Sequence, residues 1–258
     1  MYQRILSIVL AICLVGCAPK VEEKEPTVEA IRVLFVGNSH TSRNNVPLLV
    51  KRINDAQTGS PAIEASAVMW GGFKLSDHVQ NGGAVQAISR KHWDFVVMQP
   101  ASTEAFVNPD GQVASFRQLV ESVGPKTTPI LYGVWHREAG DKLHQSFGTT
   151  PAGAARAIRE TNLATIRGTR ARLAPVGDAW VTAELKHSEI PLYTDGNHAT
   201  LEGSYMAAAV ILRAILQKPL STEKVWRPWN ISEDDAKTLL EVANTVTLVS
   251  PEENLAPH

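Results

Sequence analysis

Cysteine is almost absent from the sequence. Cys13 and Cys17 are the only two among 258 residues, and both belong to the apolar N-terminal segment. Processing at Cys17 would leave a mature chain with a single cysteine, which excludes intramolecular disulfides, a cysteine nucleophile and any cysteine-based metal site. The chemistry of the mature chain must therefore come from other side chains.

An excess of charge of either sign is also missing. The 25 Lys and Arg residues nearly balance the 26 Asp and Glu residues, and the formal net charge is −1. No large basic surface is available to neutralise a phosphate backbone, so we expect no nucleic-acid partner. With 44% hydrophobic and 20% charged residues, the chain is expected to form one compact α/β domain with an ample core.

Apolar runs are short, and the N-terminal one is too short for a stable membrane anchor. It extends from Ile5 to Val15 behind Arg4, as in a secretory leader. The run ends in Leu14-Val15-Gly16-Cys17, which resembles the lipobox of bacterial lipoproteins, where a signal peptidase cuts before the Cys and its thiol takes up diacylglycerol. An uncleaved leader or a soluble secreted protein is the alternative.

The lipobox resemblance implies a location and a domain boundary. Residues 1–16 would be the signal peptide, Cys17 would carry the lipid, and the protein would be anchored in the bacterial cell envelope. Because Ala18 rather than Asp follows Cys17, the resemblance favours the outer membrane, facing the periplasm, over the inner membrane. Residues 17–30 are rich in charge and Pro, so we expect a flexible tether, with the folded domain at 31–258.

Short apolar runs alternate with helical patterns from residue 31 onward. The expected strands are 31–36, 62–69, 94–99, 129–135 and 171–176, by their length and β-branched content. Helical periodicity covers 46–53, 111–122, 152–168 and 201–215, and a last helix begins within "ISEDDAKTLLEVANTV", where Ser232 and Asp235 resemble a capping box. This alternation predicts a mainly parallel sheet covered by helices on both faces.

Polar side chains follow several of the expected strands, where ligands bind to open parallel sheets. The first strand stops at Gly37-Asn38-Ser39-His40, and "LYTDGNHAT" places Asp195 three residues before His198. A serine nucleophile needs a base within hydrogen-bond reach and a carboxylate that orients the base. In a helical turn residues three apart share a face, so Asp195 and His198 could supply both groups to Ser39.

Acyl transfer also needs donors aimed at the developing oxyanion. Three are available after the expected strands: the backbone N–H of Ser39, a backbone N–H of the Gly71-Gly72 pair, and the side-chain amide of Gln99. Glycine has no Cβ, so the pair allows a substrate to approach closely.

Four segments together resemble the SGNH (GDSL-like) hydrolases. They are "VGNSHT", "WGGFKL", "VVMQPAS" and "DGNHAT", which match blocks I, II, III and V in order, within about residues 31 to 217. The resemblance implies a three-layer α/β/α sandwich with a five-stranded parallel sheet in flavodoxin-like order. It also implies Ser39 as nucleophile and oxyanion donor, Gly72 as the block II donor, His198 as base and Asp195 as its orienting carboxylate.

The sequence departs from the family pattern at three positions. Asn38 stands where many members have Asp, and Ala199 stands where Pro often follows the His. Gln99 stands where the family name requires Asn; Gln presents the same amide on a longer stem, and a branch of the family is similar in carrying Gln there. Gln99 as third oxyanion donor rests on that likeness.

Other residues near the strand ends could line a substrate pocket. These are His40, Trp70, Trp135 and His136; His40 adjoins the nucleophile but should point away from it, so a pocket wall suits it better than the role of base. A metal site built from His40, His136, Asp195 and His198 has no HExxH or close His-x-His spacing behind it. We expect no metal and no cofactor.

The leading functional hypothesis is an envelope-anchored serine esterase that hydrolyses esters through a Ser-His-Asp triad. Short-acyl esters, including those of carbohydrates, are the substrates favoured by family analogy, and the partners are an ester substrate and the membrane through the lipid on Cys17. One alternative is a non-catalytic flavodoxin-like lipoprotein in which "GNSHTSRNN" cradles an anion. Another is an acyltransferase that uses the same residues with a sugar hydroxyl as acceptor.

Overall fold

A computed structural model describes residues 29–81 and 83–249 of the chain. The expected leader, Cys17 as the expected lipidation site and nearly all of the expected tether lie outside the described residues. The first strand begins at Ile31, where the sequence placed the start of the folded domain.

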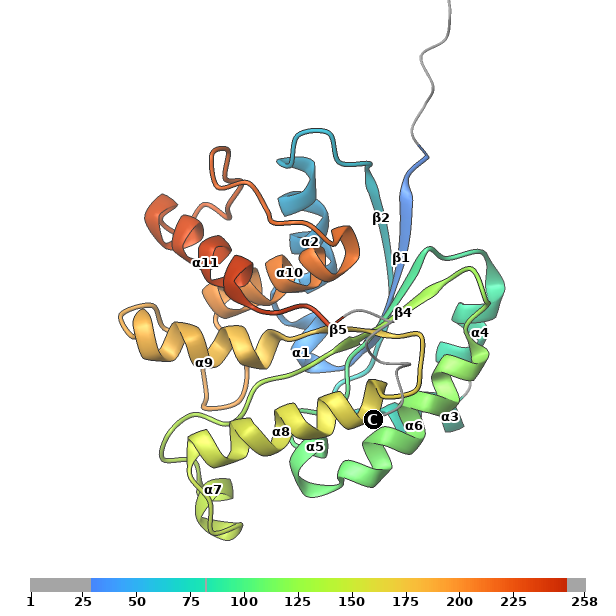
Figure 1. The fold of residues 1–258 in the computed structure, drawn as a ribbon, viewed down its shortest axis with the longest axis horizontal. Helices are drawn as coiled ribbons and strands as arrows, with labels where there is room; N and C mark the ends of the chain where they lie inside the picture. Colours follow the sequence, from blue (N-terminus) through green and yellow to red (C-terminus); the bar gives the residue numbers. More distant parts are fainter. Residues whose placement is uncertain (1–28, 82, 250–258) are drawn as a thin grey trace, which may run out of the picture.

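Five parallel strands form the central sheet (Figure 1). They are β1 (Ile31–Gly37), β2 (Ile63–Met69), β3 (Phe95–Met98), β4 (Thr128–Tyr132) and β5 (Arg172–Ala174). Their order is β2-β1-β3-β4-β5, and every neighbouring pair is parallel. This is the flavodoxin-like order that the sequence predicted.

Helices cover both faces of the sheet, so the fold is the expected three-layer α/β/α sandwich (Figure 1). One layer contains α2 (Val46–Asp55), α9 (Val176–Lys186), α10 (Leu201–Leu216) and α11 (Glu233–Thr245). The other contains α3 (Leu75–Gln80), α4 (Gly83–Arg90), α6 (Pro109–Ser122) and α8 (Pro151–Ile166). The short helices are α1 (Ser39–Ser42), η1 (Arg43–Asn45), α5 (Glu104–Val107) and α7 (Lys142–Ser146).

The sequence of β1 explains why it needs a cover on each face. Alternate residues of a strand point to opposite faces of the sheet. Val33 and Phe35 accordingly pack into the core under α2 and α10, while Leu34 and Val36 pack into the core under α4 and α6. A continuous apolar run is therefore what a parallel strand buried on both faces requires.

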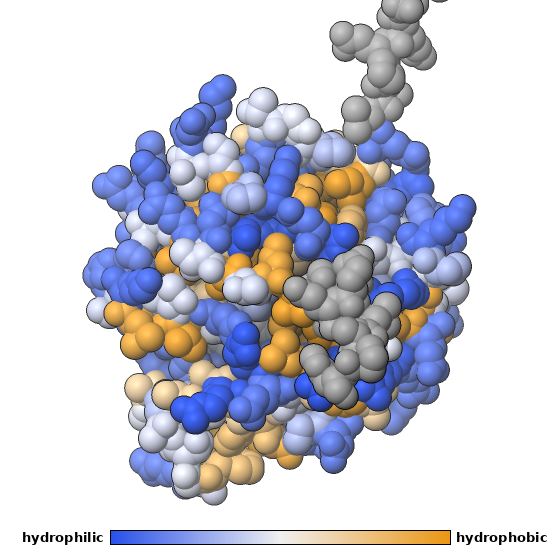
Figure 2. Space-filling model, viewed as in Figure 1, coloured by the Kyte–Doolittle hydropathy of each residue, from blue (hydrophilic) through white to orange (hydrophobic). Residues whose placement is uncertain are grey.

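The outer sides of the helices face water. On the face of the molecule shown in Figure 2, hydrophilic residues predominate around the periphery, and hydrophobic residues gather toward the middle. In the part of the chain that the structure describes, no helix has both the length and the apolar character needed to cross a bilayer.

The expected helices are present with small shifts at their ends. In α11 the Ser232 hydroxyl accepts the Asp235 N–H at 3.0 Å, as a helix N-cap does. Along one face of this helix Ala236, Leu239 and Ala243 are fully buried. α10 is buried nearly all round rather than along one face, because other helices of its layer and the sheet surround it.

β4 and β5 end two or more residues earlier than expected, and this changes the positions of the residues that follow them. β4 ends at Tyr132, so Trp135 and His136 belong to the loop beyond the sheet. β5 stops at Ala174, because Pro175 has no N–H to continue the strand and α9 begins at Val176.

The order of the strands makes β1 a topological switch point. β1 lies between β2 and β3, so the chain passes to β2 on one side of it and then to β3 on the other. Ligands bind outside the carboxyl ends of strands at such a switch point. Ser39 is the second residue after β1, so it lies at this end of the sheet.

Candidate active site

The turn that carries Ser39 is built from hydrogen bonds between its own residues and β3. Asn38 is the N-cap of α1, and its Oδ1 accepts the His40 N–H at 3.1 Å. The Asn38 N–H donates to Oε1 of Gln99, which follows β3, at 2.9 Å. Gly37 is needed below the turn, since a Cβ there would lie 2.5 Å from Thr41 Oγ1 and 2.8 Å from Gln99 Oε1.

Ser39, His198 and Asp195 come together from distant parts of the sequence. His198 Nε2 lies 2.9 Å from Ser39 Oγ, and His198 Nδ1 lies 2.8 Å from Asp195 Oδ2. Both distances are those of hydrogen bonds. This is the relative arrangement of nucleophile, base and orienting carboxylate in serine hydrolases.

Asp195 and His198 belong to a turn rather than to the helical turn expected from their spacing. Residues 194–198 are bends, and α10 begins only at Leu201. Asp195 Oδ1 accepts the N–H groups of Asn197 at 3.1 Å and of His198 at 2.8 Å. The carboxylate thus closes the turn with one oxygen and keeps the other for the imidazole.

The hydrogen bonds of this turn hold the Asp195 carboxylate in its ionised form. The backbone N–H of His198 is the largest cause that lowers the pKa of Asp195 below its usual range, and the His198 ring and the Asn197 N–H add to it. An ionised carboxylate accepts the Nδ1–H of the imidazole and leaves Nε2 free to take a proton from Ser39.

The backbone N–H groups of Ser39 and Gly72 have no acceptor among the described residues. Gly72 has φ +75°, a conformation that glycine adopts without strain. A Cβ on Gly71 or Gly72 would meet no atom within 4 Å, so the space next to this loop is open. Both groups are available to an oxyanion.

Gln99 lies directly beneath the nucleophile turn, and its side chain is 1% exposed. Its Oε1 faces the Asn38 N–H and the Thr41 hydroxyl, both at 2.9 Å, and its Nε2 donates to the Pro100 carbonyl. A backbone N–H can only donate, which fixes the orientation of the amide. Gln99 therefore holds the nucleophile turn through its oxygen.

Asn38 does more than the Asp found at its position in many SGNH hydrolases could do. Its Nδ2 donates to the Phe73 carbonyl at 2.8 Å, while Oδ1 caps α1. An ionised Asp could cap the helix but could not donate to a carbonyl. The Asn therefore links the nucleophile turn to the loop that carries Gly71 and Gly72.

Arg43 and Asn44 connect the nucleophile segment to both ends of the His198 turn. Arg43 Nη1 donates to Thr194 Oγ1 at 3.0 Å and lies 3.3 Å from Asp195 Oδ2. Asn44 Nδ2 lies 3.0 Å from the Thr200 carbonyl and 2.9 Å from Ser204 Oγ.

Sequence reasoning missed this clamp, defined here as Arg43 and Asn44. The only signal in the sequence was the pair Asn44-Asn45. In the structure both residues are left-handed, with φ angles of 56° and 52°. Asn tolerates that conformation better than most residues.

Three of the four expected pocket residues are buried, which corrects that expectation. His40, Trp135 and His136 are 4%, 2% and 5% exposed. Trp135 stacks on Trp180 with ring centroids 3.9 Å apart and donates from Nε1 to the Asn197 carbonyl at 3.0 Å. It therefore supports the His198 turn from the core and presents no open face to a ligand.

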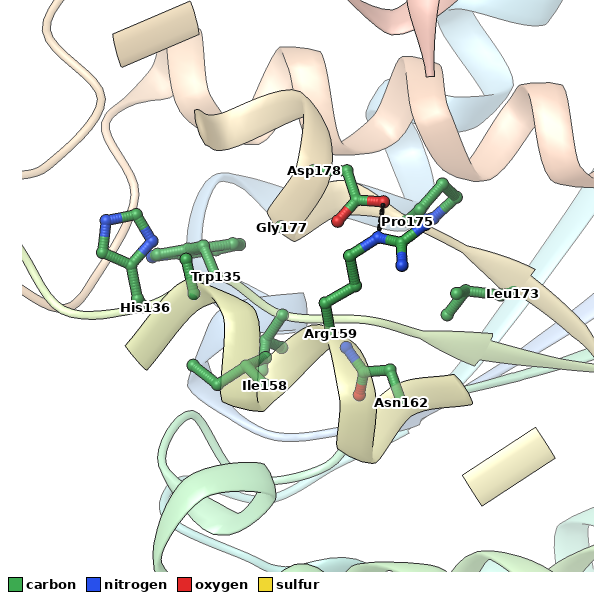
Figure 3. Close-up of a pocket in the computed structure, with 11 residues that line it drawn as sticks. Trp135, His136, Ile158, Arg159, Asn162, Leu173, Pro175, Gly177 and Asp178 are labelled. Carbon is green, nitrogen blue, oxygen red and sulfur yellow. Dashed lines mark hydrogen bonds and ion pairs between the residues drawn. The ribbon is translucent and has the colours of Figure 1, made fainter. Parts of the chain in front are cut away.

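His136 turns away from Ser39 and pairs with Glu184 of α9 at 3.2 Å. With Trp135 it borders a small cavity between α8 and α9 (Figure 3). Its volume is about 10 Å³, room for roughly one water molecule, and the Arg159–Asp178 pair crosses it. This cavity is too small for a substrate.

His40 packs between Trp135 and His198, with centroid distances of 4.9 and 5.2 Å. Burial lowers the pKa of His40 to about 3, and the positive charges of His198 and Arg137 act in the same direction. A neutral ring in this position supports the base without competing with it.

The loop after β1 offers few free donors for an anion. The N–H groups of Asn38, His40, Thr41 and Ser42 are all bonded within the turn or to Gln99. The cradle of free N–H groups that the flavodoxin-like alternative requires is therefore missing from this described segment. Among the described residues no group of three or more His, Cys, Asp or Glu side chains is placed to hold a metal ion.

No protein-family model matches this chain, and no curated protein matches it. Solved structures do. A protein from Slackia heliotrinireducens, provisionally assigned to the SGNH hydrolases, is 25% identical with a TM-score of 0.62, covering 72% of this chain and all of that one. A DUF4886 family protein from Bacteroides uniformis is 20% identical with a TM-score of 0.65, covering 84% of this chain and 94% of that one.

A catalytic mutant of an acetylxylan esterase from Geobacillus stearothermophilus is also similar. It is 16% identical with a TM-score of 0.52, covering 74% of this chain and 95% of that one. The chain therefore has the five-stranded α/β fold of SGNH-type hydrolases, and the protein from Slackia heliotrinireducens supports a hydrolase-type activity.

Proposed function

We propose that this protein is a serine ester hydrolase of the SGNH type. The observation that carries the proposal is the continuous hydrogen-bonded series from Ser39 Oγ through His198 to Asp195. The N–H groups of Ser39 and Gly72, which have no acceptor among the described residues, would supply the second requirement of acyl transfer, a site for the oxyanion.

In the proposed reaction Ser39 Oγ attacks the ester carbonyl while His198 Nε2 takes its proton. The N–H groups of Ser39 and Gly72, with Nε2 of Gln99, stabilise the oxyanion of the tetrahedral intermediate. The intermediate collapses to an acyl-enzyme as His198 returns the proton to the leaving alcohol. Water, deprotonated by His198, then releases the acid and restores Ser39.

We infer short acyl groups as the preferred acids. The catalytic residues are near the surface, with the Asp195 side chain 48% exposed and the His198 side chain 25% exposed. A long acyl chain gains most of its binding energy from an enclosed apolar channel. A site open to solvent gives a long acyl chain no such channel, so it favours a short acyl group, and it leaves room for a bulky alcohol.

The test is hydrolysis of p-nitrophenyl acetate and of longer p-nitrophenyl esters by the wild type and site variants. Ser39→Ala and His198→Ala should lose nearly all turnover, and Asp195→Asn should lose less. Ser42→Ala is the matched control, because Ser42 lies in the same short helix but outside the triad. Wild-type turnover by Ser39→Ala would refute the nucleophile assignment.

We also propose that the protein is lipid-anchored at Cys17 in the bacterial cell envelope. β1 begins at Ile31, at the amino edge of the sheet, while Ser39 follows the carboxyl end of the same strand. Seven residues of strand span roughly 23 Å, so a tether entering at Ile31 would hold the site away from the membrane. Labelling with radioactive palmitate should mark the wild type but not Cys17→Ala; equal labelling would contradict the anchor.

A further inference from the structure

A large aromatic side chain stands exposed next to the proposed oxyanion site. Trp70 is 59% exposed, and it directly precedes Gly71 and Gly72. Phe73 follows the two glycines. The centroids of the Trp70 and Phe73 rings lie 6.1 Å apart, and the ring planes are inclined by 32°. An exposed apolar surface of this kind at a functional site marks a place where something binds.

The aromatic pair, Trp70 and Phe73, is held at a fixed place relative to Ser39. The Trp70 N–H donates to the Gly37 carbonyl at 3.1 Å, and Asn38 Nδ2 donates to the Phe73 carbonyl at 2.8 Å. Gly37 and Asn38 are the two residues before Ser39. A ligand on the pair would therefore be placed beside the nucleophile.

His78 supports the pair from below. It is 1% exposed, its ring lies 5.3 Å from that of Phe73, and its Nε2 lies 2.9 Å from the Gly37 carbonyl. A carbonyl only accepts, so Nε2 carries the proton. Burial lowers the pKa of His78, which keeps the ring neutral.

A cavity of about 260 Å³ adjoins the pair. Its lining consists of Trp70, Phe73, His78, Asn81, Gly83 and Ala84, so aromatic surface and one side-chain amide meet there without a charged group. Its volume is close to the lower end of ligand sites, about 300 Å³, which suits a ligand of one ring. β2, which leads into this loop, is an edge strand of the sheet (Figure 1), so a longer molecule could extend outward.

We infer that Trp70 and Phe73 form a platform for a neutral sugar ring of the ester substrate, whose acyl group reaches Ser39. This rests on the proposed esterase function and names its alcohol component. A pyranose has a flat C–H face that matches an exposed indole ring, and hydroxyls that an amide such as Asn81 can bond. A charged alcohol would need a group of opposite charge in the lining of the cavity, which holds none among the described residues. A long flexible acyl chain would not cover the flat exposed face of the Trp70 ring.

The first experiment compares two acetyl esters, acetylated xylo-oligosaccharide and ethyl acetate, by acid release at constant pH. Trp70→Ala should lower the ratio of kcat/KM for the sugar ester over ethyl acetate about tenfold, mainly through KM, and Trp70→Phe should recover part of it. Trp229→Ala is the matched control, since Trp229 is 91% exposed on a different loop. A ratio in Trp70→Ala equal to that of the wild type would overturn the platform.

A binding measurement separates failure of the platform from failure of the esterase. Calorimetric titration of deacetylated xylo-oligosaccharide into Ser39→Ala should give binding that Ser39→Ala/Trp70→Ala loses. Binding that persists in the double variant overturns the platform whatever the enzyme hydrolyses. Hydrolysis of neither ester, with Trp70-dependent binding intact, would overturn the esterase and leave the platform standing.

Discussion

Asn38 shows how one side chain can join two loops of the candidate site. It is 3% exposed and uses Oδ1 for the cap of α1 and Nδ2 for the Phe73 carbonyl. Its neighbour Ser39 therefore depends on it for position, although Asn38 touches no reacting atom.

Asn38→Asp should impair the protein even though Asp is common at this position in the family it resembles. The variant keeps the cap but loses the donor and places a buried carboxylate against the Phe73 carbonyl. We expect a loss of unfolding free energy of about 1–3 kcal/mol and a lower kcat on p-nitrophenyl acetate. Urea unfolding and steady-state kinetics would measure both, and wild-type values for both would contradict the link between the loops.

Gln99 holds the nucleophile turn, and we propose that it also donates to the oxyanion. Gln99→Ala removes both the acceptor under Asn38 and the amide donor, so kcat should fall about 10²–10³-fold if Nε2 binds the oxyanion. Thr41→Val removes one bond to Gln99 Oε1 and leaves the donor, so its loss should be much smaller. Unchanged turnover in Gln99→Ala would remove Gln99 from the oxyanion site.

At the scale of elements, the site depends on how the segment after β1 meets the turn before α10. Asn44 and Arg43 bond to both ends of the 194–200 segment, and Trp135 bonds to its middle through Asn197. The two loops are held from the nucleophile side and from the core side. His198 thereby reaches Ser39 without belonging to a helix or strand itself.

Two variants of Asn44 would separate its side chain from its backbone conformation. Asn44→Ala and Asn44→Gly both lose the bonds to the Thr200 carbonyl and the Ser204 hydroxyl, but Gly adopts φ +56° without the steric cost that Ala has. We expect both to lower kcat alike, and Asn44→Ala to lose about 1 kcal/mol more stability than Asn44→Gly. If Asn44→Gly keeps wild-type kcat, the clamp does not position His198.

The elements themselves could be read from the sequence because their signals are local. The continuous apolar run of β1 and the apolar spacing of α2 and α11 gave their ranges within a few residues. The clamp could not be read in this way, since Asn44 contacts residues about 155 positions away and nothing periodic marks it.

The expectation for Trp135 and His136 was wrong for a tertiary reason. Position after a strand indicated a pocket wall, but Trp135 is drawn inward by its stack on Trp180 and His136 by its pairing with Glu184. Both partners lie in α9, beyond the next strand. Trp70 has no such partner in the core, and it alone of the four remains open to solvent.

At the scale of the whole molecule, buried histidines tie stability to pH. His40 and His78 are 4% and 1% exposed, and burial lowers the pKa of each. The unfolded chain takes up protons at these rings below the ordinary histidine pKa of about 6.5, whereas folded His40 does so only near 3. Protonation therefore favours the unfolded state between these two values.

The contribution of His40 to the free energy of unfolding should thus be constant above pH 6.5, and it should fall as the pH drops from there toward 3. Each unit of pKa difference is worth about 1.4 kcal/mol, so the loss amounts to a few kcal/mol. The positive charges of His198 and Arg137 also lower the pKa of His40 and so enlarge this loss of stability. The depressed pKa of Asp195 causes a further loss of stability only at still lower pH. Urea unfolding from pH 7.5 to 4 would measure the slope. His40→Gln should flatten it relative to His92→Gln, a matched change at a half-exposed histidine, and equal slopes in the two variants would show that His40 is not its source.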